Sequence, residues 1–382
     1  MKRRGTNEPV DLDNPNIAML KTFVDRYDPG KHYLPSTPSG PTGFVLHGEP
    51  GTRHDVHGGW NYMGVTEHYH AYGEINDCLL HSECGSEGMC CRESAEKFLP
   101  PEDLTVTSMQ ENLVWKYHGE WWCTLNRDST VFGRPRSFNQ FIAMSQYLQS
   151  EGVRFIVEAN RRRAMRNSGT IIWQFNEPSP NISCSTLVDY YRIPKSAYFG
   201  VKRGYAPLNV TLYYRSLVQT GTTDLELWVF NDHAERPLDI TLRIRDIRGT
   251  VIDSQEFHCI APHNGSSKIA DIRLPVPETV ESAFFVELSY NNLSKTFLFS
   301  TDAERLLREL PNRPAGPLSV EKNSSGYLVK NHGEYACVGV MAHKDFLLDN
   351  GFDLFPGESR LLPTKPGNYT LDVDDFTYIN QP

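Results

Sequence analysis

The chain has 382 residues, enough for two or three domains with large buried cores. Hydrophobic residues make up 39% of it and charged residues 22%, which excludes disorder along the whole chain. The 38 Lys and Arg residues against 47 Asp and Glu residues give a net charge of −9, so we expect neither nucleic acid nor a membrane as a partner.

The N-terminus begins with a basic cluster, Lys2 to Arg4, but polar residues from Gly5 to Pro9 follow where a signal peptide would be apolar. No apolar run of the sequence approaches the ~20 residues that cross a bilayer. Eight cysteines are too few for a disulfide framework in a chain of this length, so we expect reduced thiols. These features indicate a cytoplasmic protein, a prediction that an export signal upstream of this sequence would change.

The first 206 residues alternate helical patterns with short apolar runs. Asn16 to Tyr27 predicts an amphipathic helix. Ser137 to Arg166 predicts one helix capped by Ser137, or two helices with a break at Gly152. Gly169 to Phe175 predicts a short buried strand. A helix, a buried strand and a polar loop in this order are typical of an α/β barrel or a doubly wound sheet.

From residue 207 onward the hydrophobic pattern has a period of two, as in Leu225 to Phe230 and Ile240 to Arg245. Strands at this spacing predict a β-sandwich over residues 207–301. Residues 302–317 predict a linker with a short helix from Asp302 to Leu310, and residues 318–382 predict a second, smaller sandwich. The fold class is therefore multidomain, α/β followed by all-β.

Three carboxylates are candidates for an acid, base or nucleophile. Glu83 follows the apolar Cys78 to Leu80, where a strand would end, and Gly85 allows the chain to turn and expose the side chain. Asn7-Glu8 and Asn176-Glu177 are each an amide–carboxylate pair. Glu83 is the strongest single candidate, and by local geometry Glu177 is its better placed partner because it follows the predicted buried strand.

Tryptophan is concentrated in the first part of the chain, where Trp60, Trp115, Trp121, Trp122 and Trp173 lie. Flat apolar faces of this kind stack on a sugar ring while Asn, Glu and His side chains bind its hydroxyls. Most of these rings are individually expected in the core. Together with the carboxylates, they indicate a carbohydrate substrate.

A zinc site is the competing chemistry, because imidazole and thiolate are the ligands that zinc prefers. The sequence has neither two matched Cys-x-x-Cys pairs nor a His-Glu-x-x-His motif. We therefore expect no metal, although many potential ligands lie close together in the sequence: His54, His57, His68, His70, Cys78, His81, Cys84, Cys90 and Cys91.

Four motifs and a short tail occur in a fixed order: Asp28 to Gly40, His57-Gly58-Gly59-Trp60, Ser82-Glu83-Cys84-Gly85, Trp173-Gln174-Phe175-Asn176-Glu177-Pro178, then Asp189-Tyr190-Tyr191 and Lys195. This ordered set resembles the β-mannosidases of glycoside hydrolase family 2 over residues 5 to 207. The remainder resembles the immunoglobulin-like sandwiches that follow the barrel in that family. Exo-β-D-glucosaminidases and other β-glycosidases of the family are the nearest alternative.

The resemblance implies that residues 1–206 form the C-terminal half of a (β/α)8 TIM barrel, followed by two immunoglobulin-like β-sandwiches. It assigns Glu83 as the nucleophile and Glu8 as the acid/base of a retaining mechanism without a cofactor. Chain order then places Glu177 in the loop after the eighth strand, against the local preference. The resemblance also implies a sugar site formed by Asn7, Trp60, Trp173 and Asn176.

The expected function is release of terminal β-D-mannose from β-mannosides. Because the resemblance begins at the end of the fourth barrel strand, we expect an N-terminally truncated form, with the missing N-terminal half of the barrel as a partner. A non-catalytic carbohydrate-binding remnant is the alternative from another functional class.

Overall fold

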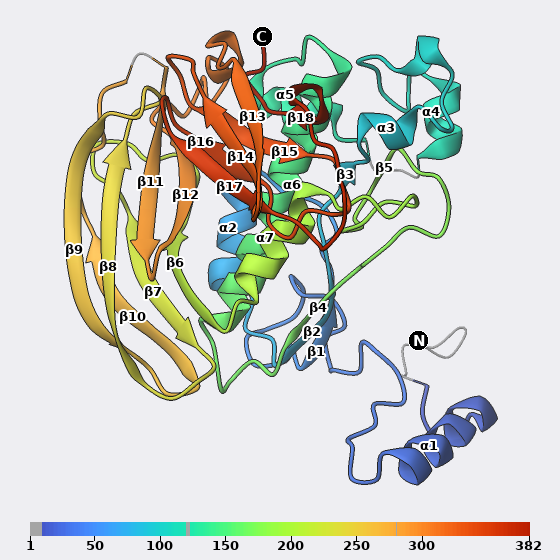
Figure 1. Ribbon diagram of the computed structural model, residues 1–382. Helices are drawn as coiled ribbons and strands as arrows, with labels where there is room; N and C mark the ends of the chain where they lie inside the picture. Colours follow the sequence, from blue (N-terminus) through green and yellow to red (C-terminus); the bar gives the residue numbers. More distant parts are fainter. Residues whose placement is uncertain (1–9, 120–122, 280) are drawn as a thin grey trace.

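The computed structural model describes residues 10–119, 123–279 and 281–382 (Figure 1). Two packed helices, α6 (Phe138–Arg161) and α7 (Ser196–Gly204), occupy the middle of the molecule. A small parallel sheet lies on one side of them and an antiparallel sandwich on the other (Figure 1).

The parallel sheet contains β1 (Asp55–His57), β2 (Leu80–Cys84) and β4 (Thr170–Ile172) in the order β1-β2-β4. Both pairs are parallel, and β2 lies in the centre. The segment before β1 runs beside it, because Phe44 forms a parallel bridge with His57. Parallel strands need long crossovers, and α6 lies in the one that joins β2 to β4.

The predicted strand at Gly169 to Phe175 exists, but the prediction that it is buried is wrong. Only Thr170–Ile172 is a strand, and Ile171 is 57% exposed and Phe175 60% exposed. The reason is that β4 pairs with β2 alone, so one edge of β4 is open among the described residues. An apolar groove of about 470 Å³ lies beside this edge, lined in part by Ile171, Phe175 and Tyr198.

Helix α6 is continuous, so of the two alternatives the single helix is confirmed. The Ser137 hydroxyl caps it by accepting a hydrogen bond from the Gln140 N–H at 3.2 Å. Gly152 does not break the helix. A Cβ there would lie 3.0 Å from the Tyr62 ring and 3.3 Å from the His68 ring, so glycine allows both rings to pack closely on the helix.

Shorter elements connect β1, β2 and α6, and the elements α3, α4 and α5 form a helical cluster with its own core. A two-stranded antiparallel sheet, β3 with β5, joins the segment after β2 to the segment after β4. The bounds are α2 (Glu67–His70), η1 (Ala71–Ile75), β3 (Gly88–Met89), α3 (Arg92–Ala95), η2 (Pro101–Asp103), α4 (Leu113–His118), α5 (Leu125–Phe132) and β5 (Ser183–Cys184).

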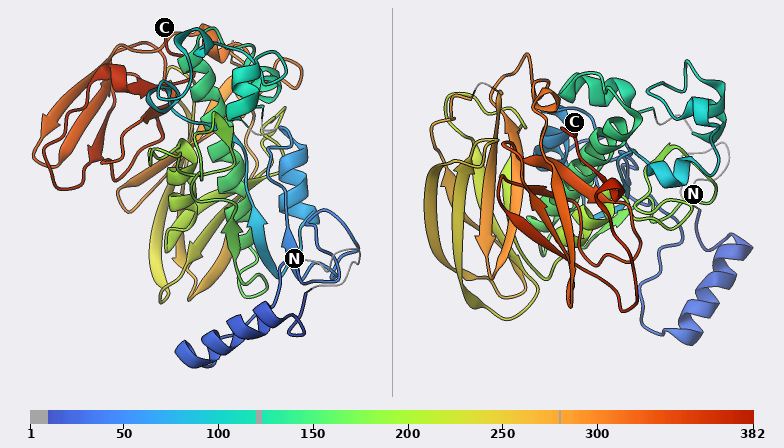
Figure 2. Two further views of the ribbon diagram at one scale, coloured as in Figure 1. Left: turned by 90° about the vertical axis from the view of Figure 1, so that its right-hand side faces the viewer. Right: turned by 45° about the horizontal axis from the view of Figure 1, so that its top comes forward.

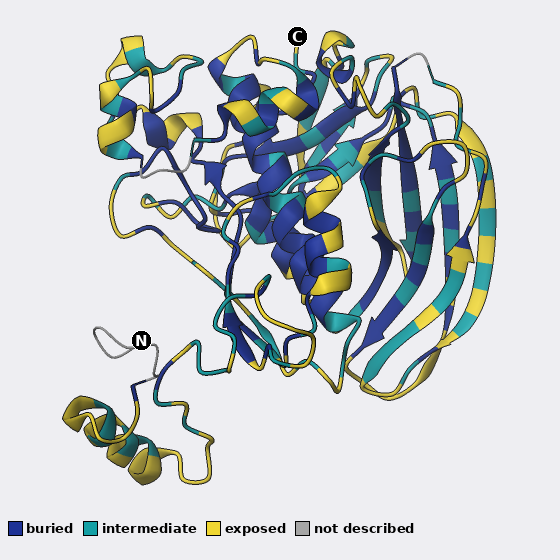
Figure 3. Cartoon of the chain, turned by 180° about the vertical axis from the view of Figure 1, so that it is seen from behind, coloured by how far each residue is buried: buried dark blue, intermediate teal, exposed yellow. Residues whose placement is uncertain are grey.

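Helix α1 (Pro15–Tyr27) confirms the predicted helix at the N-terminal end, and Asn14 caps it by accepting from the Asn16 N–H at 3.0 Å. Figures 1 and 2, which view the molecule from different sides, both show α1 projecting away from the rest of the molecule. None of its residues is buried, as Figure 3 shows, and Leu20 and Phe23 are each 49% exposed. Its apolar side therefore has no covering layer among the described residues.

The sandwich consists of two antiparallel sheets that enclose the main core, which includes Leu227, Leu242 and Phe285. The strands predicted from alternation, such as Leu225 to Phe230 and Ile240 to Arg245, are confirmed. One sheet has the order β10-β7-β6, with β6 (Leu208–Tyr214), β7 (Leu225–Asn231) and β10 (Gly265–Ile272). The other has the order β12-β11-β8-β9, with β8 (Arg236–Arg245), β9 (Val251–Ala261), β11 (Ala283–Tyr290) and β12 (Leu293–Ser300).

The C-terminal residues form two further small sheets around a separate core that contains Val329, Val340 and Leu362. Their orders are β13-β14-β17 and β16-β15-β18. The strands are β13 (Leu318–Asn323), β14 (Gly326–Asn331), β15 (Cys337–Ala342), β16 (Phe352–Leu354), β17 (Ser359–Pro363) and β18 (Phe376–Thr377), with η4 at Val373–Asp375.

The predicted helix from Asp302 to Leu310 is wrong. This segment forms turns that end in the short 3-10 helix η3 (Leu310–Asn312). The physical reason is that Leu306 adopts a positive φ of 54°, which a helix does not allow, while Leu307 and Leu310 are buried in the main core. Burial of these two leucines outweighs the local helical pattern.

No helix in the described ranges is both long enough and apolar enough to cross a membrane. The division of the chain at residues 206, 301 and 317 stays a prediction.

The contact at Gly152 gives a test of the fold. We expect Gly152→Leu to destabilise the protein by about 1–3 kcal/mol, because the new side chain must displace the buried Tyr62 and His68 rings. Urea unfolding measures the change. The control is Asn139→Leu at a half-buried position of the same helix, and an equal effect of both substitutions would contradict the packing described here.

Candidate active site

Glu83 lies near the C-terminal end of β2, the central strand of the parallel sheet. The strand includes Glu83 and Cys84, so it extends further than the sequence pattern indicated. The carboxylate Oε2 lies 3.4 Å from Nδ1 of His57, which is the register partner of Glu83 on β1. No described residue forms a hydrogen bond with Oε1, so one carboxylate oxygen remains available to a ligand.

Burial is the largest influence on the pKa values of Glu83 and His57. The Glu83 side chain is 21% exposed and that of His57 is 15% exposed. Burial raises the pKa of Glu83, and the nearby carboxylate of Asp55 raises it further. Burial also lowers the pKa of His57, although Asp55 acts in the opposite direction. The hydrogen bond of the His57 ring joins its Nε2 to the Thr37 hydroxyl at 2.9 Å, and the contact of Nδ1 with Glu83 is longer, at 3.4 Å.

The buried carboxylate of Asp55 lies near His57 and shares the Thr37 hydroxyl with it. Asp55 is 4% exposed, and its Oδ2 accepts hydrogen bonds from the backbone N–H of Ser39 at 2.8 Å and from the Ser39 hydroxyl at 3.0 Å. Its Oδ1 accepts from the hydroxyls of Ser82 and Thr37. The Thr37 hydroxyl also lies 2.9 Å from Nε2 of His57. Hydrogen bonds therefore link Asp55 and His57 through the Thr37 hydroxyl, and Nδ1 of His57 lies 3.4 Å from Glu83.

The backbone around Glu83 is held on both sides. The Gly58 N–H donates to the carbonyl of Glu83 at 2.8 Å, and the Trp173 N–H donates to the carbonyl of Cys84 at 2.7 Å. Gly58 has a φ of +89°, and a Cβ there would lie 2.1 Å from the Phe44 ring. Only glycine fits this close approach, which brings the Gly58 segment against the end of β2.

The residues expected to line the sugar site lie at different depths. Trp173 is 46% exposed and follows β4, directly beside the end of β2. Trp60 is half-buried against Phe44, and its indole N–H has no acceptor among the described residues. Asn176 is exposed in the loop after β4. The structure thus brings Trp173 next to the Glu83 strand end, and the roles of all three residues stay predictions.

Glu177 does not face an open site. It is 3% exposed, and its Oε1 forms an ion pair with the buried Lys195 at 2.9 Å and accepts from the Thr186 hydroxyl at 2.6 Å. Burial acts to lower the pKa of Lys195, but the Glu177 carboxylate raises it above its usual range. The local preference for Glu177 as a catalytic partner of Glu83 is therefore wrong, because this carboxylate holds the loop after β4 in place.

The histidines and cysteines of residues 54–91 do not gather around one point. Within the described ranges, no three His, Cys, Asp or Glu side chains are placed to hold a metal ion. His68 is buried and its Nε2 lies 3.0 Å from the carbonyl of Gly152. Burial raises the pKa of the Cys78, Cys84 and Cys90 thiols, which disfavours the thiolate form that zinc binds.

The expected acid/base Glu8 and its neighbour Asn7 lie outside the described residues. The sequence motif Asp28 to Gly40 contains Thr37 and Ser39 but gave them no role, and Asp55 belongs to none of the motifs. Thr37 and Ser39 lie 18 and 16 residues before Asp55, and no local pattern links them to it. His57 belongs to the motif His57-Gly58-Gly59-Trp60, and this motif is the sequence feature that indicated it.

Comparisons with known proteins give a consistent resemblance. No protein-family model matches the chain. A β-mannosidase B from Thermothelomyces thermophilus is 25% identical over 274 residues, which are 64% of this chain and 31% of that protein. An exo-β-D-glucosaminidase from Arthroderma benhamiae is 30% identical over 122 residues, which are 29% of this chain and 14% of that protein.

Solved structures agree in fold. A β-D-mannosidase from Dictyoglomus thermophilum matches with a TM-score of 0.70 and 19% identity, over 91% of this chain and 42% of that chain. An exo-chitosanase from Amycolatopsis orientalis matches with a TM-score of 0.62 and 16% identity, over 84% of this chain and 44% of that chain. The expected resemblance to β-mannosidases is therefore confirmed, and the chain spans less than half the length of these relatives.

The ion pair of Glu177 and Lys195 can be tested by breaking it from one side. We expect Lys195→Met to cost about 3–5 kcal/mol of stability, because it leaves a buried carboxylate without a partner. The double variant Glu177→Gln with Lys195→Met should be much less destabilised. Urea unfolding compares the two, and a double variant as unstable as the single one would contradict the account.

The raised pKa of Glu83 makes a prediction about stability. A carboxyl group whose pKa is higher in the folded than in the unfolded chain opposes folding when ionised, so stability falls as pH rises through this pKa. We expect Glu83→Gln to raise Tm at pH 7 by about 1–3 °C, with no gain at a pH where both states are protonated.

Thermal unfolding at several pH values measures this effect of Glu83→Gln. The control is Glu321→Gln on the exposed face of β13, which should leave Tm unchanged at every pH. A Tm at pH 7 that falls in Glu83→Gln would show that the ionised carboxylate stabilises the fold instead.

Proposed function

We propose that this chain forms the nucleophile-bearing part of a retaining exo-β-glycosidase that releases terminal β-D-mannose from β-mannosides. The observation that carries the proposal is the position of Glu83: a partly buried carboxylate at the end of the central parallel strand, in contact with His57 and beside the exposed Trp173. The resemblance to a β-mannosidase B and to a β-D-mannosidase of known structure supports mannose as the sugar.

In this mechanism Glu83 attacks the anomeric carbon and forms a covalent glycosyl-enzyme, which water then hydrolyses. Nδ1 of His57 lies 3.4 Å from Oε2 of Glu83, and Oε1, which has no hydrogen-bond partner among the described residues, is the oxygen that we assign to the attack. Glu8 protonates the leaving oxygen and then activates the water, and Asn7 binds the sugar 2-hydroxyl. These two roles rest on the resemblance alone. Trp173, Trp60 and Asn176 complete the sugar site, and no cofactor takes part in these steps.

We further propose that β1, β2 and β4 are the last strands of a (β/α)8 barrel, closed in the active protein by strands that pair with β4. The open edge of β4 and the apolar groove beside it support this, because an uncovered parallel edge is unusual. The β-D-mannosidase match, which covers 42% of that longer chain, is consistent with further barrel strands. The sandwich and the C-terminal sheets would then be the two immunoglobulin-like domains.

A trapping experiment tests the role of Glu83. A 2-deoxy-2-fluoro-β-mannosyl fluoride should add one fluoromannosyl group to the peptide that contains Glu83, because the fluorine slows hydrolysis of the covalent intermediate. Peptide mass spectrometry locates the label. Glu83→Gln should show no label, while Glu321→Gln, on the exposed face of β13, should keep it.

Three other outcomes would change the proposal. A label on another carboxylate, in a preparation that hydrolyses mannosides, would remove Glu83 from the mechanism. Faster cleavage of a β-glucosaminide than of a β-mannoside would favour the exo-β-D-glucosaminidase alternative, which the match to that enzyme supports. Binding of a mannoside without label or product, in a protein with the barrel closed, would favour a carbohydrate-binding remnant.

A further inference from the structure

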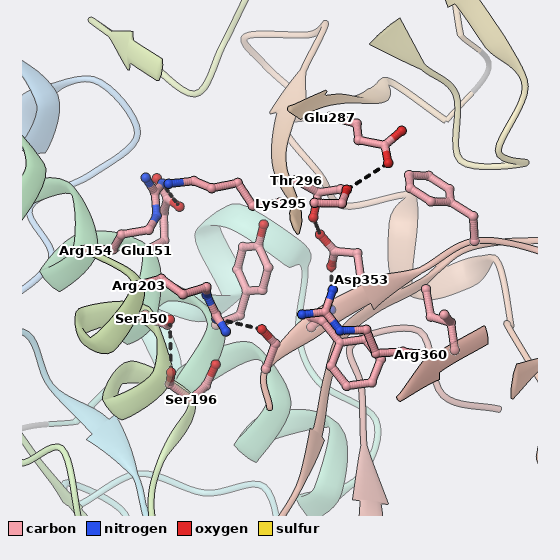
Figure 4. A pocket seen from close by; sticks show the side chains of 18 of the residues that line it. Ser150, Glu151, Arg154, Ser196, Arg203, Glu287, Lys295, Thr296, Asp353 and Arg360 are labelled. Atoms are coloured by element: carbon pink, nitrogen blue, oxygen red, sulfur yellow. Dashed lines mark hydrogen bonds and ion pairs between the residues drawn. The ribbon is translucent and has the colours of Figure 1, made fainter. Parts of the chain in front are cut away.

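A polar cavity is lined by residues between Tyr147 and Arg360, away from the sheet that carries Glu83. It has a volume of about 220 Å³ and lies where α6 and α7 meet strands β12, β16 and β17 (Figure 4). We call it the junction cavity and define it by Tyr147, Arg203, Lys295, Thr296, Asp353 and Arg360. None of the residues that line it belongs to β1, β2 or β4.

The charges of the junction cavity balance. Four basic and four acidic side chains line it. A lining of this kind attracts neither an anion nor a cation overall, because each added charge meets groups of both signs. A volume of about 220 Å³ is below the ~300–1,000 Å³ of most small-molecule pockets, so the junction cavity suits a single small ring at most. The charge balance favours a neutral ligand that can form many hydrogen bonds.

Two arginines of the junction cavity share the carboxylate of Asp349, Arg203 at 3.2 Å and Arg360 at 2.7 Å. Arg203 also donates to the carbonyls of Asn350 and Gly351, so the unused donors belong to Arg360. Only one nitrogen of Arg360, Nη2, has an acceptor within the described part of the chain. The side chains of Arg203 and Arg360 are each 30% exposed, so both are reached from solvent.

The Asp353 carboxylate can accept further hydrogen bonds, because each of its oxygens accepts only one. Asp353 accepts hydrogen bonds from the Thr296 hydroxyl at 2.6 Å and the Gly339 N–H at 2.8 Å. No Lys, Arg or His in the described ranges comes within ion-pair distance of it, and burial raises its pKa, as expected for a carboxylate without a cation. The Tyr147 hydroxyl, which also lines the cavity, has no hydrogen-bond partner among the described residues.

From this arrangement we propose that the junction cavity binds a neutral polyhydroxylated ligand, a saccharide unit held between Asp353, Arg360 and Tyr147. Sugar hydroxyls donate and accept at once, so one ring can donate to the carboxylate and accept from the guanidinium. Hydrogen bonds to charged groups are about twice as strong as neutral ones. This saccharide site is separate from the proposed active site and does not depend on its activity.

The test titrates D-mannose and D-glucose into the full chain, with saturation-transfer NMR and calorimetry as readouts. We expect millimolar binding of at least one sugar, weakened about tenfold in Asp353→Asn, which loses a charge-assisted hydrogen bond. Tyr147→Phe keeps the ring and removes only the hydroxyl, so it should weaken binding about threefold even if Asp353→Asn folds poorly. Asp374→Asn, on the exposed surface of the same C-terminal region, is the matched control and should bind normally.

Binding should also survive in Glu83→Ala, since the junction cavity contains none of the residues around Glu83. Absence of sugar binding to the folded chain would overturn the proposal, as would binding that neither Asp353→Asn nor Tyr147→Phe weakens. Inorganic phosphate is the third probe. If phosphate binds more tightly than either sugar and Arg360→Gln abolishes this binding, the junction cavity is an anion site instead.

Discussion

The pairing of β2 between two parallel neighbours determines where Glu83 can lie. Its backbone carbonyl accepts from Gly58 N–H on the β1 side, and the carbonyl of Cys84 accepts from Trp173 N–H on the β4 side. Side chains at the carboxyl ends of parallel strands meet at one edge of the sheet, so the same pairing brings His57 to this carboxylate and the Trp173 backbone to the end of β2. Helix α6 lies in the crossover between β2 and β4.

This placement has an electrostatic cost that the surroundings offset only in part. Burial and Asp55 both raise the pKa of Glu83, while neutral His57 provides a single long contact to Oε2. Glu177 differs, since Lys195 and the Thr186 hydroxyl bind its Oε1 and the Tyr190 N–H donates to its Oε2. Two carboxylates that look alike in the sequence therefore have different tasks: one is left with an available oxygen, and the other stabilises a loop. A shifted pKa, as at Glu83, is typical of functional groups.

Much of the fold follows from local signals in the sequence. The Ser137 cap, the Asn16 to Tyr27 helix and the sandwich strands each depend on neighbouring residues, so periodicity and capping predict them. Contacts between segments that are not neighbours in the chain could not be predicted in this way. Gly152 packs against rings more than 80 residues away along the chain, Leu307 and Leu310 enter a core built mainly by the sandwich, and Lys195 finds Glu177 18 residues earlier. Ile171 of β4 is exposed because β4 lies at the edge of the described sheet, and the local sequence pattern does not show whether a strand has a neighbour on both sides.

The proposed mechanism depends on the carboxyl groups of Glu83 and Glu8, of which Glu8 lies outside the described residues. The most direct measurement is their separation in a crystal structure of the protein with its barrel closed and a sugar bound. The account predicts ~5–5.5 Å between the carboxyl groups of Glu8 and Glu83, the spacing of a retaining glycosidase. A separation of ~6.5–9.5 Å would indicate an inverting mechanism, and a Glu8 remote from the sugar would contradict its assignment as the acid/base.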